Sequence, residues 1–243
     1  LDGQPASKWL EARQAELADL TSFSTPQQAF FFTTHWGLAG ARDGRLAIET
    51  KGKAGSKKVT VSFAKLHQGA WGPAFPPDGL AQKEDVTFGR TATGFGYVHV
   101  RRCKETLPAL IDEALAKIGE VPGLVLDFRG NGGGGFDHEA LFGRFLCKGR
   151  DWRAGVTYRS AGEHPYGGPI VVLVDGAVRS AGETGAGIFK EDGRAYMIGE
   201  SATAGMSSQK TTIELPSQLF ALKVSVSSNK ARFQGGKGIE GVG

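Results

Sequence analysis

Residues 124–135 read LVLDFRGNGGGG, and residues 169–183 read PIVVLVDGAVRSAGE. Each segment begins with a short apolar run, typical of a buried strand, and then reaches a turn. The first turn supplies a glycine run with free backbone N–H groups, and the second supplies Ser180 where a helix is expected to begin. A nucleophile beside an anion-binding backbone loop is what acyl transfer requires. The two segments therefore point to acyl-transfer chemistry.

The chain around these segments predicts alternating strands and helices. Residues 94–100, 107–118 and 123–128 read as strand, helix and strand. These two strands should be parallel and joined by a right-handed crossover. Further elements are expected in this order: a helix over 138–147, a strand over 169–174, a helix over 180–190, a strand over 195–198, and a hairpin of 210–215 with 218–226. The pattern indicates an α/β core over residues 84–243.

The preceding residues predict a smaller unit. Helices are expected over 6–20 and 27–36, the second capped by Thr25 and Pro26, with the aromatic cluster Phe30–Phe32 largely buried. A hairpin of 46–50 with 59–61 should follow, around a polar turn that carries four lysines. Residues 66–83 are rich in Gly and Pro and read as a linker. The expected domains are 1–65, a linker over 66–83, and 84–243.

Composition narrows the classes of function. The net charge is +4, and no basic stripe with interleaved aromatic residues is present, which argues against a nucleic-acid partner. The longest apolar run is far below the ~20 residues of a membrane span. Cys103 and Cys147 lie far apart with no CxxC pattern, which favours two buried thiols, although one disulfide in an exported protein stays open. The glycine run lacks the Gly-Lys-Ser/Thr ending of a phosphate loop. No cofactor or metal is expected.

Five motifs in order carry a resemblance to a known family. They are residues 94–98 (GFGYV), 126–133 (LDFRGNGG), 180–183 (SAGE), 199–200 (GE) and 238–240 (GIE). Together they resemble the C-terminal processing (tail-specific) serine peptidases, whose relatives include tricorn-like peptidases and the repeats of interphotoreceptor retinoid-binding proteins. The resemblance implies an α/β fold with a ClpP/crotonase-like core.

Residues 1–65 resemble the second half of a PDZ-like module, because a DGQP segment precedes a helix and a hairpin follows. An unrelated small α/β lid is the alternative. Because the chain begins at Leu1 without Met or a leader, we expect further residues upstream.

The resemblance assigns roles to specific residues. Ser180 matches the first serine of the family's Ser-Ala-Ser-Glu segment and is the expected nucleophile; the alternative is a simple N-cap. Backbone N–H groups of the oxyanion hole are expected from Gly132, Gly133, Gly134 and Ala181, although a run of glycines also fits a flexible turn.

The general base is harder to assign. Bacterial processing peptidases use a lysine in a segment resembling Gly-Glu-Lys-Thr-Phe-Gly-Lys-Gly, and residues 199–206 (GESATAGM) place Gly205 at that position. The tricorn-like branch instead uses a histidine and a late glutamate, which Glu240 matches; a surface carboxylate is the alternative. Because the histidine of that branch precedes the PDZ-like module, we expect the base upstream of Leu1. His138 is a weaker candidate as base or substrate contact, and His99 reads as a sheet residue.

The expected function is therefore a serine endopeptidase that cleaves unfolded or C-terminally exposed polypeptides through an acyl-enzyme. The alternative is a catalytically inactive binding module for a peptide or small apolar ligand, favoured by the missing lysine and the missing upstream histidine. An acyl-CoA enzyme of the crotonase type would not need Ser180 at a helix start. The resemblance implies a polypeptide substrate, allows a homo-oligomer, and suggests a periplasmic or secreted protein by analogy.

Overall fold

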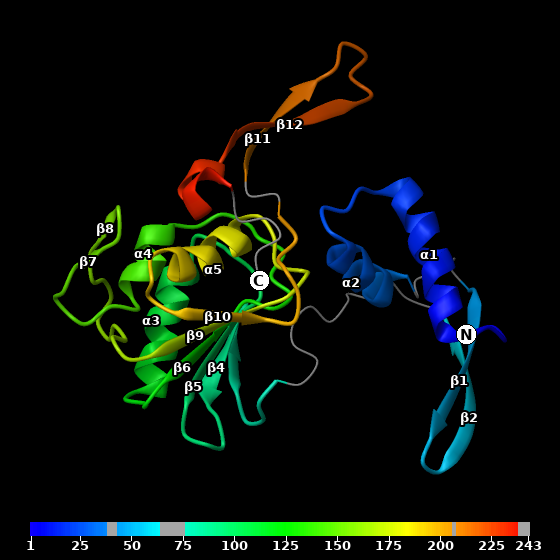
Figure 1. Cartoon of the computed structure of the whole chain (residues 1–243), viewed down its shortest axis with the longest axis horizontal. Coiled ribbons are helices and arrows are strands. Elements are labelled where there is room, and N and C mark those ends of the chain that lie inside the picture. The colour runs from blue at the N-terminus through cyan, green and yellow to red at the C-terminus, as the bar shows by residue number, and fades with distance from the viewer. Residues whose placement is uncertain (38–42, 64–75, 206–207, 238–243) are drawn as a thin grey trace. The chain divides into compact units, whose positions relative to one another are not determined.

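The computed structural model describes residues 1–37, 43–63, 76–205 and 208–237 (Figure 1). The chain divides into two compact units, Leu1–Ala70 and Trp71–Gly243. Within the described ranges, no helix combines the length and the apolar character needed to cross a membrane.

The first unit contains two helices and one hairpin. Helix α1 (Ala6–Leu20) contacts helix α2 (Pro26–Trp36), and the expected cap is confirmed because the Thr25 hydroxyl accepts a hydrogen bond from Gln28 N at 3.1 Å. The prediction that Phe30–Phe32 is largely buried is wrong for Phe30, which is 57% exposed. Consecutive helical residues point about 100° apart, so three in a row cannot share one buried face; Ala29 and Thr33, four residues apart, face inward instead.

The hairpin pairs strand β1 (Arg45–Gly52) with strand β2 (Gly55–Ser62) in antiparallel register. Gly52 pairs with Gly55, so the turn is only two residues long, and the lysines expected in it lie mostly on the exposed strands. The amino terminus is tied to this hairpin: Asp2 N donates to Ala47 O at 2.8 Å, and Ala47 N donates to Asp2 Oδ1 at 2.9 Å.

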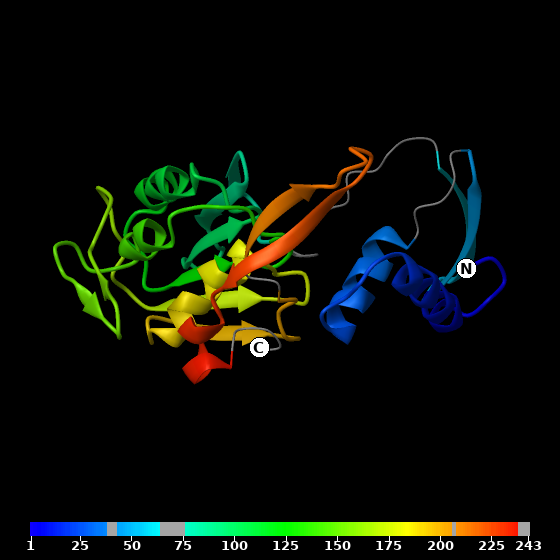
Figure 2. The same ribbon diagram turned by 90° about the horizontal axis from the view of Figure 1, so that it is seen from above.

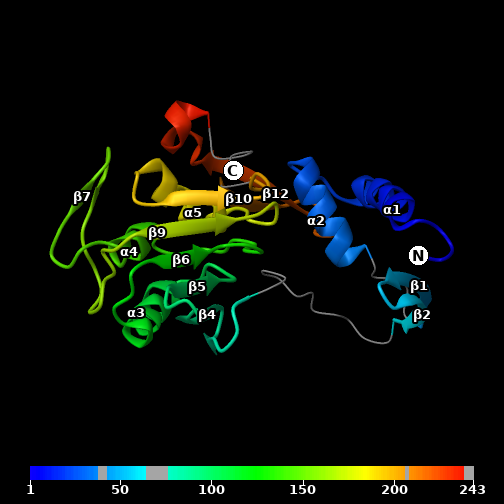
Figure 3. The ribbon, with the colours of Figure 1, turned by 60° about the horizontal axis from the view of Figure 1, so that its bottom comes forward.

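The second unit is built on a six-stranded sheet in the order β10-β9-β6-β5-β4-β3. Figure 3 shows β4, β5, β6, β9 and β10 side by side. The four strands from β5 to β10 run parallel, as the strand–helix–strand pattern predicts, whereas β4 and β3 are antiparallel. The strands are β3 (Ala81–Lys83), β4 (Val86–Arg90), β5 (Gly96–Val100), β6 (Leu124–Asp127), β9 (Ile170–Val174) and β10 (Tyr196–Gly199). Strand β3 lies within the segment predicted to be a linker. Its three residues are exposed, so the sequence had no apolar pattern there to indicate a strand.

Three helices cover the sheet. Helix α3 (Leu107–Ile118) packs on β4 and β5, α5 (Ala181–Glu191) packs on β9 and β10, and α4 (His138–Gly143) contacts both helices. The apolar stripe of α3 lies in the core with Phe128, Phe142 and Phe189. Helix α4 ends four residues before the expected Cys147, because Arg144 N and Phe145 N donate to carbonyls three residues back and tighten the chain into a turn.

The remaining elements lie at the edges of this unit. Short strands β7 (Trp152–Arg153) and β8 (Thr157–Tyr158) form one hairpin, and β11 (Ser208–Glu214) and β12 (Ala221–Ser228) form a second that projects from the body of the unit (Figure 2). Two 3₁₀ turns follow, η1 (Lys230–Arg232) and η2 (Gln234–Gly236). Arg232 forms an ion pair with Asp192, and Phe233 is buried in the core. These contacts anchor the chain beyond the projecting hairpin.

Candidate active site

The topology brings the two diagnostic turns together. Strands β6 and β9 are parallel neighbours, so their carboxyl ends meet at one edge of the sheet. A methyl group added at Gly133 would lie 2.8 Å from Ser180 Cβ, 2.8 Å from Arg179 O and 3.2 Å from Ala181 N. Gly133 also has a φ of +89°. Only glycine fits this contact without displacing its neighbours, so the glycine loop packs directly against the candidate nucleophile.

Ser180 has the backbone of a sharp strand-to-helix turn. Its φ is +56° and its ψ is −128°, a conformation that a side-chain-bearing residue adopts only when its surroundings enforce it. Ser180 N donates to Gly205 O at 3.2 Å, and Thr184 N donates to Ser180 O at 3.1 Å. The serine side chain makes no capping hydrogen bond to α5. This geometry matches an exposed nucleophile turn better than a simple N-cap.

Asn131 holds the glycine loop in place. Its Nδ2 donates to Val100 O at 2.8 Å, and its Oδ1 accepts a hydrogen bond from Gly133 N at 2.8 Å. Cys103 adds two backbone bonds, from its N to Gly133 O (3.1 Å) and from Gly135 N to its O (3.0 Å). Burial raises the pKa of the Cys103 thiol to about 12, which keeps it protonated. The loop is therefore a fixed structure and not a flexible turn.

These bonds distinguish the expected oxyanion donors from one another. Gly133 N is already engaged by Asn131 and is not free to bind a substrate oxygen. Gly132 N, Gly134 N and Ala181 N have no acceptor within the described residues. The N–H of Ala181 is the first of helix α5 and carries the partial positive charge of a helix N-terminus. The structure therefore leaves three of the four expected donors open.

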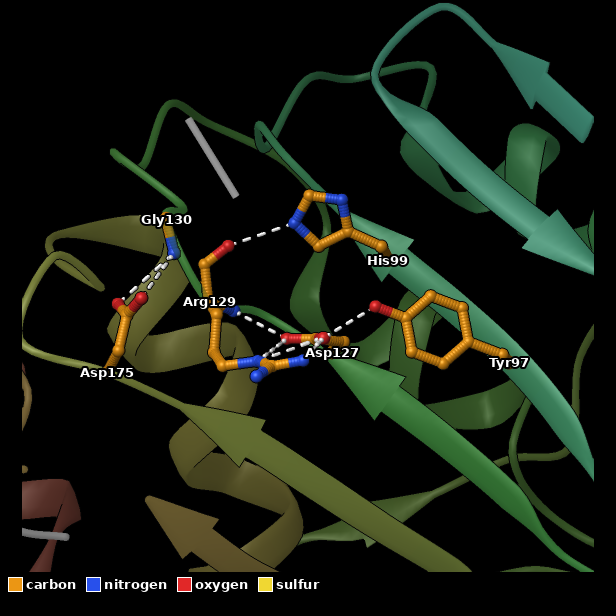
Figure 4. A network of polar contacts seen from close by, with 6 residues as sticks. All are labelled: Tyr97, His99, Asp127, Arg129, Gly130 and Asp175. Atoms are coloured by element: carbon orange, nitrogen blue, oxygen red, sulfur yellow. Dashed lines mark hydrogen bonds and ion pairs between the residues drawn. The ribbon is translucent and has the colours of Figure 1, made fainter. Parts of the chain in front are cut away.

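A buried polar network fixes the base of the loop (Figure 4). The carboxylate of Asp127 accepts from Arg129 Nε and Nη2, at 3.0 and 2.6 Å, and from Tyr97 Oη at 2.6 Å. His99 Nε2 lies 2.9 Å from Arg129 O, which agrees with a sheet residue. Burial and the charge of Asp127 raise the pKa of the Tyr97 phenol. Because Arg129 neutralises Asp127, the network is a structural brace.

Asp175 adds a second brace, from the end of β9. Its carboxylate accepts a hydrogen bond from Gly130 N at 3.1 Å (Figure 4). It also accepts one from Ala177 N at 2.9 Å, so it joins the two diagnostic turns. Burial raises the pKa of the Asp175 carboxyl.

Gly205 lies beside Ser180, where the sequence aligns it with the lysine of bacterial processing peptidases. Besides accepting from Ser180 N, Gly205 forms a bridge to Arg179. Gly205 N donates to Glu183 Oε1 at 3.0 Å, and Thr203 Oγ1 donates to the same oxygen at 2.5 Å. The sequence alone did not predict this role of Glu183, although Glu183 is the last residue of the SAGE motif at 180–183. No basic side chain extends from the Gly205 position.

The candidate bases occupy different environments. The His138 ring lies 4.2 Å from the Phe136 ring, and its Nε2 is buried without a partner in the described part of the chain. Burial lowers the pKa of His138, partly opposed by Asp137 and the Ala181 backbone, so the imidazole is neutral at pH 7. Glu240 lies outside the described residues. No cluster of three His, Cys, Asp or Glu side chains within those residues could hold a metal ion.

Solved structures resemble this chain to different degrees. Mature CPAF aligns with a TM-score of 0.63 over 93% of this chain and 66% of its own, at 11% identity. The photosystem II D1 C-terminal processing protease is 22% identical over 78% of this chain, with a TM-score of 0.45, and this chain spans 51% of its length. A putative peptidase from Parabacteroides merdae is 18% identical over 88% of this chain and 74% of its own, with a TM-score of 0.48. At 11% identity, the likeness to mature CPAF concerns the fold alone.

No curated protein matches the sequence. Residues 94–243, more than half of the chain, match the sequence profile of peptidase family S41. This region contains Ser180, the glycine loop and both braces. The chain belongs to peptidase family S41.

Proposed function

We propose that residues 71–243 form the core of a serine endopeptidase that cleaves unfolded or C-terminally exposed polypeptides through an acyl-enzyme. One observation carries the proposal: the strained Ser180 backbone is packed against Gly133, which puts a nucleophile next to free backbone donors. Membership of family S41 supports peptidase chemistry. Strain and close packing at a turn are what a pre-organised nucleophile requires.

The reaction would proceed in two steps. Ser180 Oγ attacks the peptide carbonyl carbon, a base takes the hydroxyl proton, and the carbonyl oxygen becomes an oxyanion. The N–H groups of Gly132, Gly134 and Ala181 would bind that oxyanion; losing one such donor typically costs on the order of 10²–10³ in rate. Breaking the C–N bond releases an amine that takes up the proton, and water then hydrolyses the serine ester.

A histidine outside residues 1–243 would act as the base, oriented by Glu240. Gly205 supports this assignment, because it lies beside Ser180 and has no side chain. Strands near Ser180 would pair with the extended substrate by strand addition, and the first unit would be part of a PDZ-like module. By analogy with exported relatives, the protein would act in the periplasm or outside the cell. The same Gly205 is the observation that favours the alternative, a non-catalytic binding module.

Labelling with a fluorophosphonate separates the two functions. The probe is applied to this chain and to a version extended at the amino terminus, and the labelled residue is identified by mass spectrometry. Labelling at position 180 that Ser180→Ala abolishes, and that Ser217→Ala in the projecting hairpin does not, supports the peptidase. If neither version is labelled, the peptidase proposal fails and the binding module remains.

A further inference from the structure

A small pocket opens beside the glycine loop and is lined by three arginines. Its lining residues are Arg101, Arg102, Arg179, Gly130 and Gly132, and its volume is about 30 Å³. We propose that this pocket binds a carboxylate of the polypeptide substrate close to the bond that is cut. The inference rests on the proposed peptidase function for the identity of the ligand, and not for the existence of the site.

Arg179 is fixed at the junction of the pocket and the active site. Its backbone N donates to Asn131 O at 3.1 Å, and its Nε donates to Gly132 O at 3.4 Å. A methyl group at Gly132 would lie 3.8 and 3.9 Å from Nε and Nη2, so the guanidinium rests against the loop. Arg179 is exposed, and its side chain makes no ion pair within the described residues.

The other two arginines come from the segment after β5. Arg101 forms an ion pair with Asp85, a buried carboxylate that Lys104 also contacts at 2.5 Å. One carboxylate therefore serves two cations. Arg102 is exposed and has no acidic partner within the described ranges. The carboxylates beneath the loop do not offset this charge, because Asp127 is paired with Arg129 and Asp175 is buried against backbone N–H groups.

The size and chemistry of the pocket select a small anion. Its volume is roughly a tenth of the ~300 Å³ at which drug-sized ligand sites begin, so it matches a single small group of a ligand. A planar guanidinium binds a carboxylate through two parallel hydrogen bonds, which makes a carboxylate a good match.

The position of the pocket connects it to catalysis. Gly132 both lines the pocket and offers a free N–H to the oxyanion, and Arg179 directly precedes Ser180. Because one extended residue spans about 3.5 Å, a carboxylate held here belongs within a residue or two of the scissile bond. It could come from an acidic side chain or from the C-terminal carboxylate of the substrate.

The test measures carboxylate binding without requiring catalysis. The ¹⁵N-labelled chain is titrated with N-acetyl-aspartate N-methylamide (a side-chain carboxylate), N-acetyl-alanine (a C-terminal carboxylate) and the neutral N-acetyl-asparagine N-methylamide. We expect one or both acids to shift the Gly130 and Gly132 amides and the Arg179 Nε–H, and the asparagine probe to shift none. The better-binding acid identifies the source of the carboxylate. We expect Arg102→Gln and Arg179→Gln each to weaken binding by about three- to tenfold, and Arg150→Gln, which removes an exposed arginine elsewhere, to leave it unchanged.

Three results would overturn the proposal. The acid and asparagine probes shift the amides equally, no probe shifts them, or Arg102→Gln and Arg179→Gln leave carboxylate binding unchanged. This result is separable from that of fluorophosphonate labelling. If Ser180 is labelled but no carboxylate binds, the carboxylate-site proposal is refuted and the peptidase proposal is supported. If a carboxylate binds but Ser180 is not labelled, the carboxylate site is supported and the peptidase proposal is refuted.

Discussion

Replacing Asn131 with alanine should unlock the glycine loop and destabilise the second unit. Asn131 is fully buried. Its side-chain amide donates a hydrogen bond to Val100 O and accepts one from Gly133 N, both at 2.8 Å. Alanine leaves both backbone groups buried without these partners, and each such loss costs about 1–3 kcal/mol. The expected decrease in the free energy of unfolding is therefore about 2–6 kcal/mol, a large part of the ~5–15 kcal/mol of a typical domain.

Amide hydrogen exchange at the central strands β6 and β9 measures this decrease in the second unit alone, independently of the first. Gln82→Ala is the matched control, because it removes the same amide from an exposed position on β3 of the same sheet. That change should alter protection by less than ~0.5 kcal/mol. If Asn131→Ala also stays below that limit, the two bonds do not hold the loop and the reasoning is refuted.

Three further changes test other parts of the site. Gly133→Ala places a methyl group 2.8 Å from Ser180 Cβ at a φ of +89°, so we expect fluorophosphonate labelling to fall at least about tenfold; unchanged labelling would contradict the packing. Iodoacetamide at pH 8 should modify exposed Cys147 and spare Cys103, whose burial raises its thiol pKa to about 12, and intact mass would show one adduct rather than two. His138→Asn should reduce acid sensitivity: burial lowers the pKa of His138 below 6.5, so protonation favours the unfolded chain, and stability is lost as the pH falls from about 6.5. Urea midpoints between pH 7 and 5 measure this effect, and parallel curves for the two proteins would exclude it.

Much of the second unit was predictable because strand and helix periodicities are local. The apolar runs that became β6 and β9 located the two diagnostic turns, and strand–helix–strand spacing gave the parallel pairing. The local pattern failed to predict burial where the surroundings of a side chain depend on segments distant in the sequence. Phe30 lies in a correctly predicted helix, but the sequence could not show which side of that helix would be covered.

The fine structure of the site was less predictable for the same reason. Four glycines in a row look equivalent in sequence, yet Asn131 Oδ1 occupies Gly133 N and Cys103 O occupies Gly135 N, and only Gly132 N and Gly134 N lack an acceptor within the described residues. Glu183 closes the SAGE motif and Arg102 lies in no motif, but neither could be given its role, because the Gly205 loop and the arginine pocket form only when distant segments meet. The branch within family S41, the PDZ-like assignment of residues 1–65, the domain boundaries and the compartment stay predictions.

The environment of Ser180 constrains the kind of base that can serve it. Arg179 and Arg102 place positive charge near the site, and neither can accept a proton at physiological pH. A lysine base would need its pKa lowered from about 10.4 by roughly three units to be largely neutral at pH 7, a shift that requires deep burial or close cations. Gly205 provides no such side chain, and Ser180 is only partly buried. A histidine, with an ordinary pKa of about 6.5, is already mostly neutral at pH 7, and nearby cations favour that neutral form. Because the same cations would also lower the pKa of a lysine, they do not select the base by themselves; the proposed histidine is the group that needs the smaller shift.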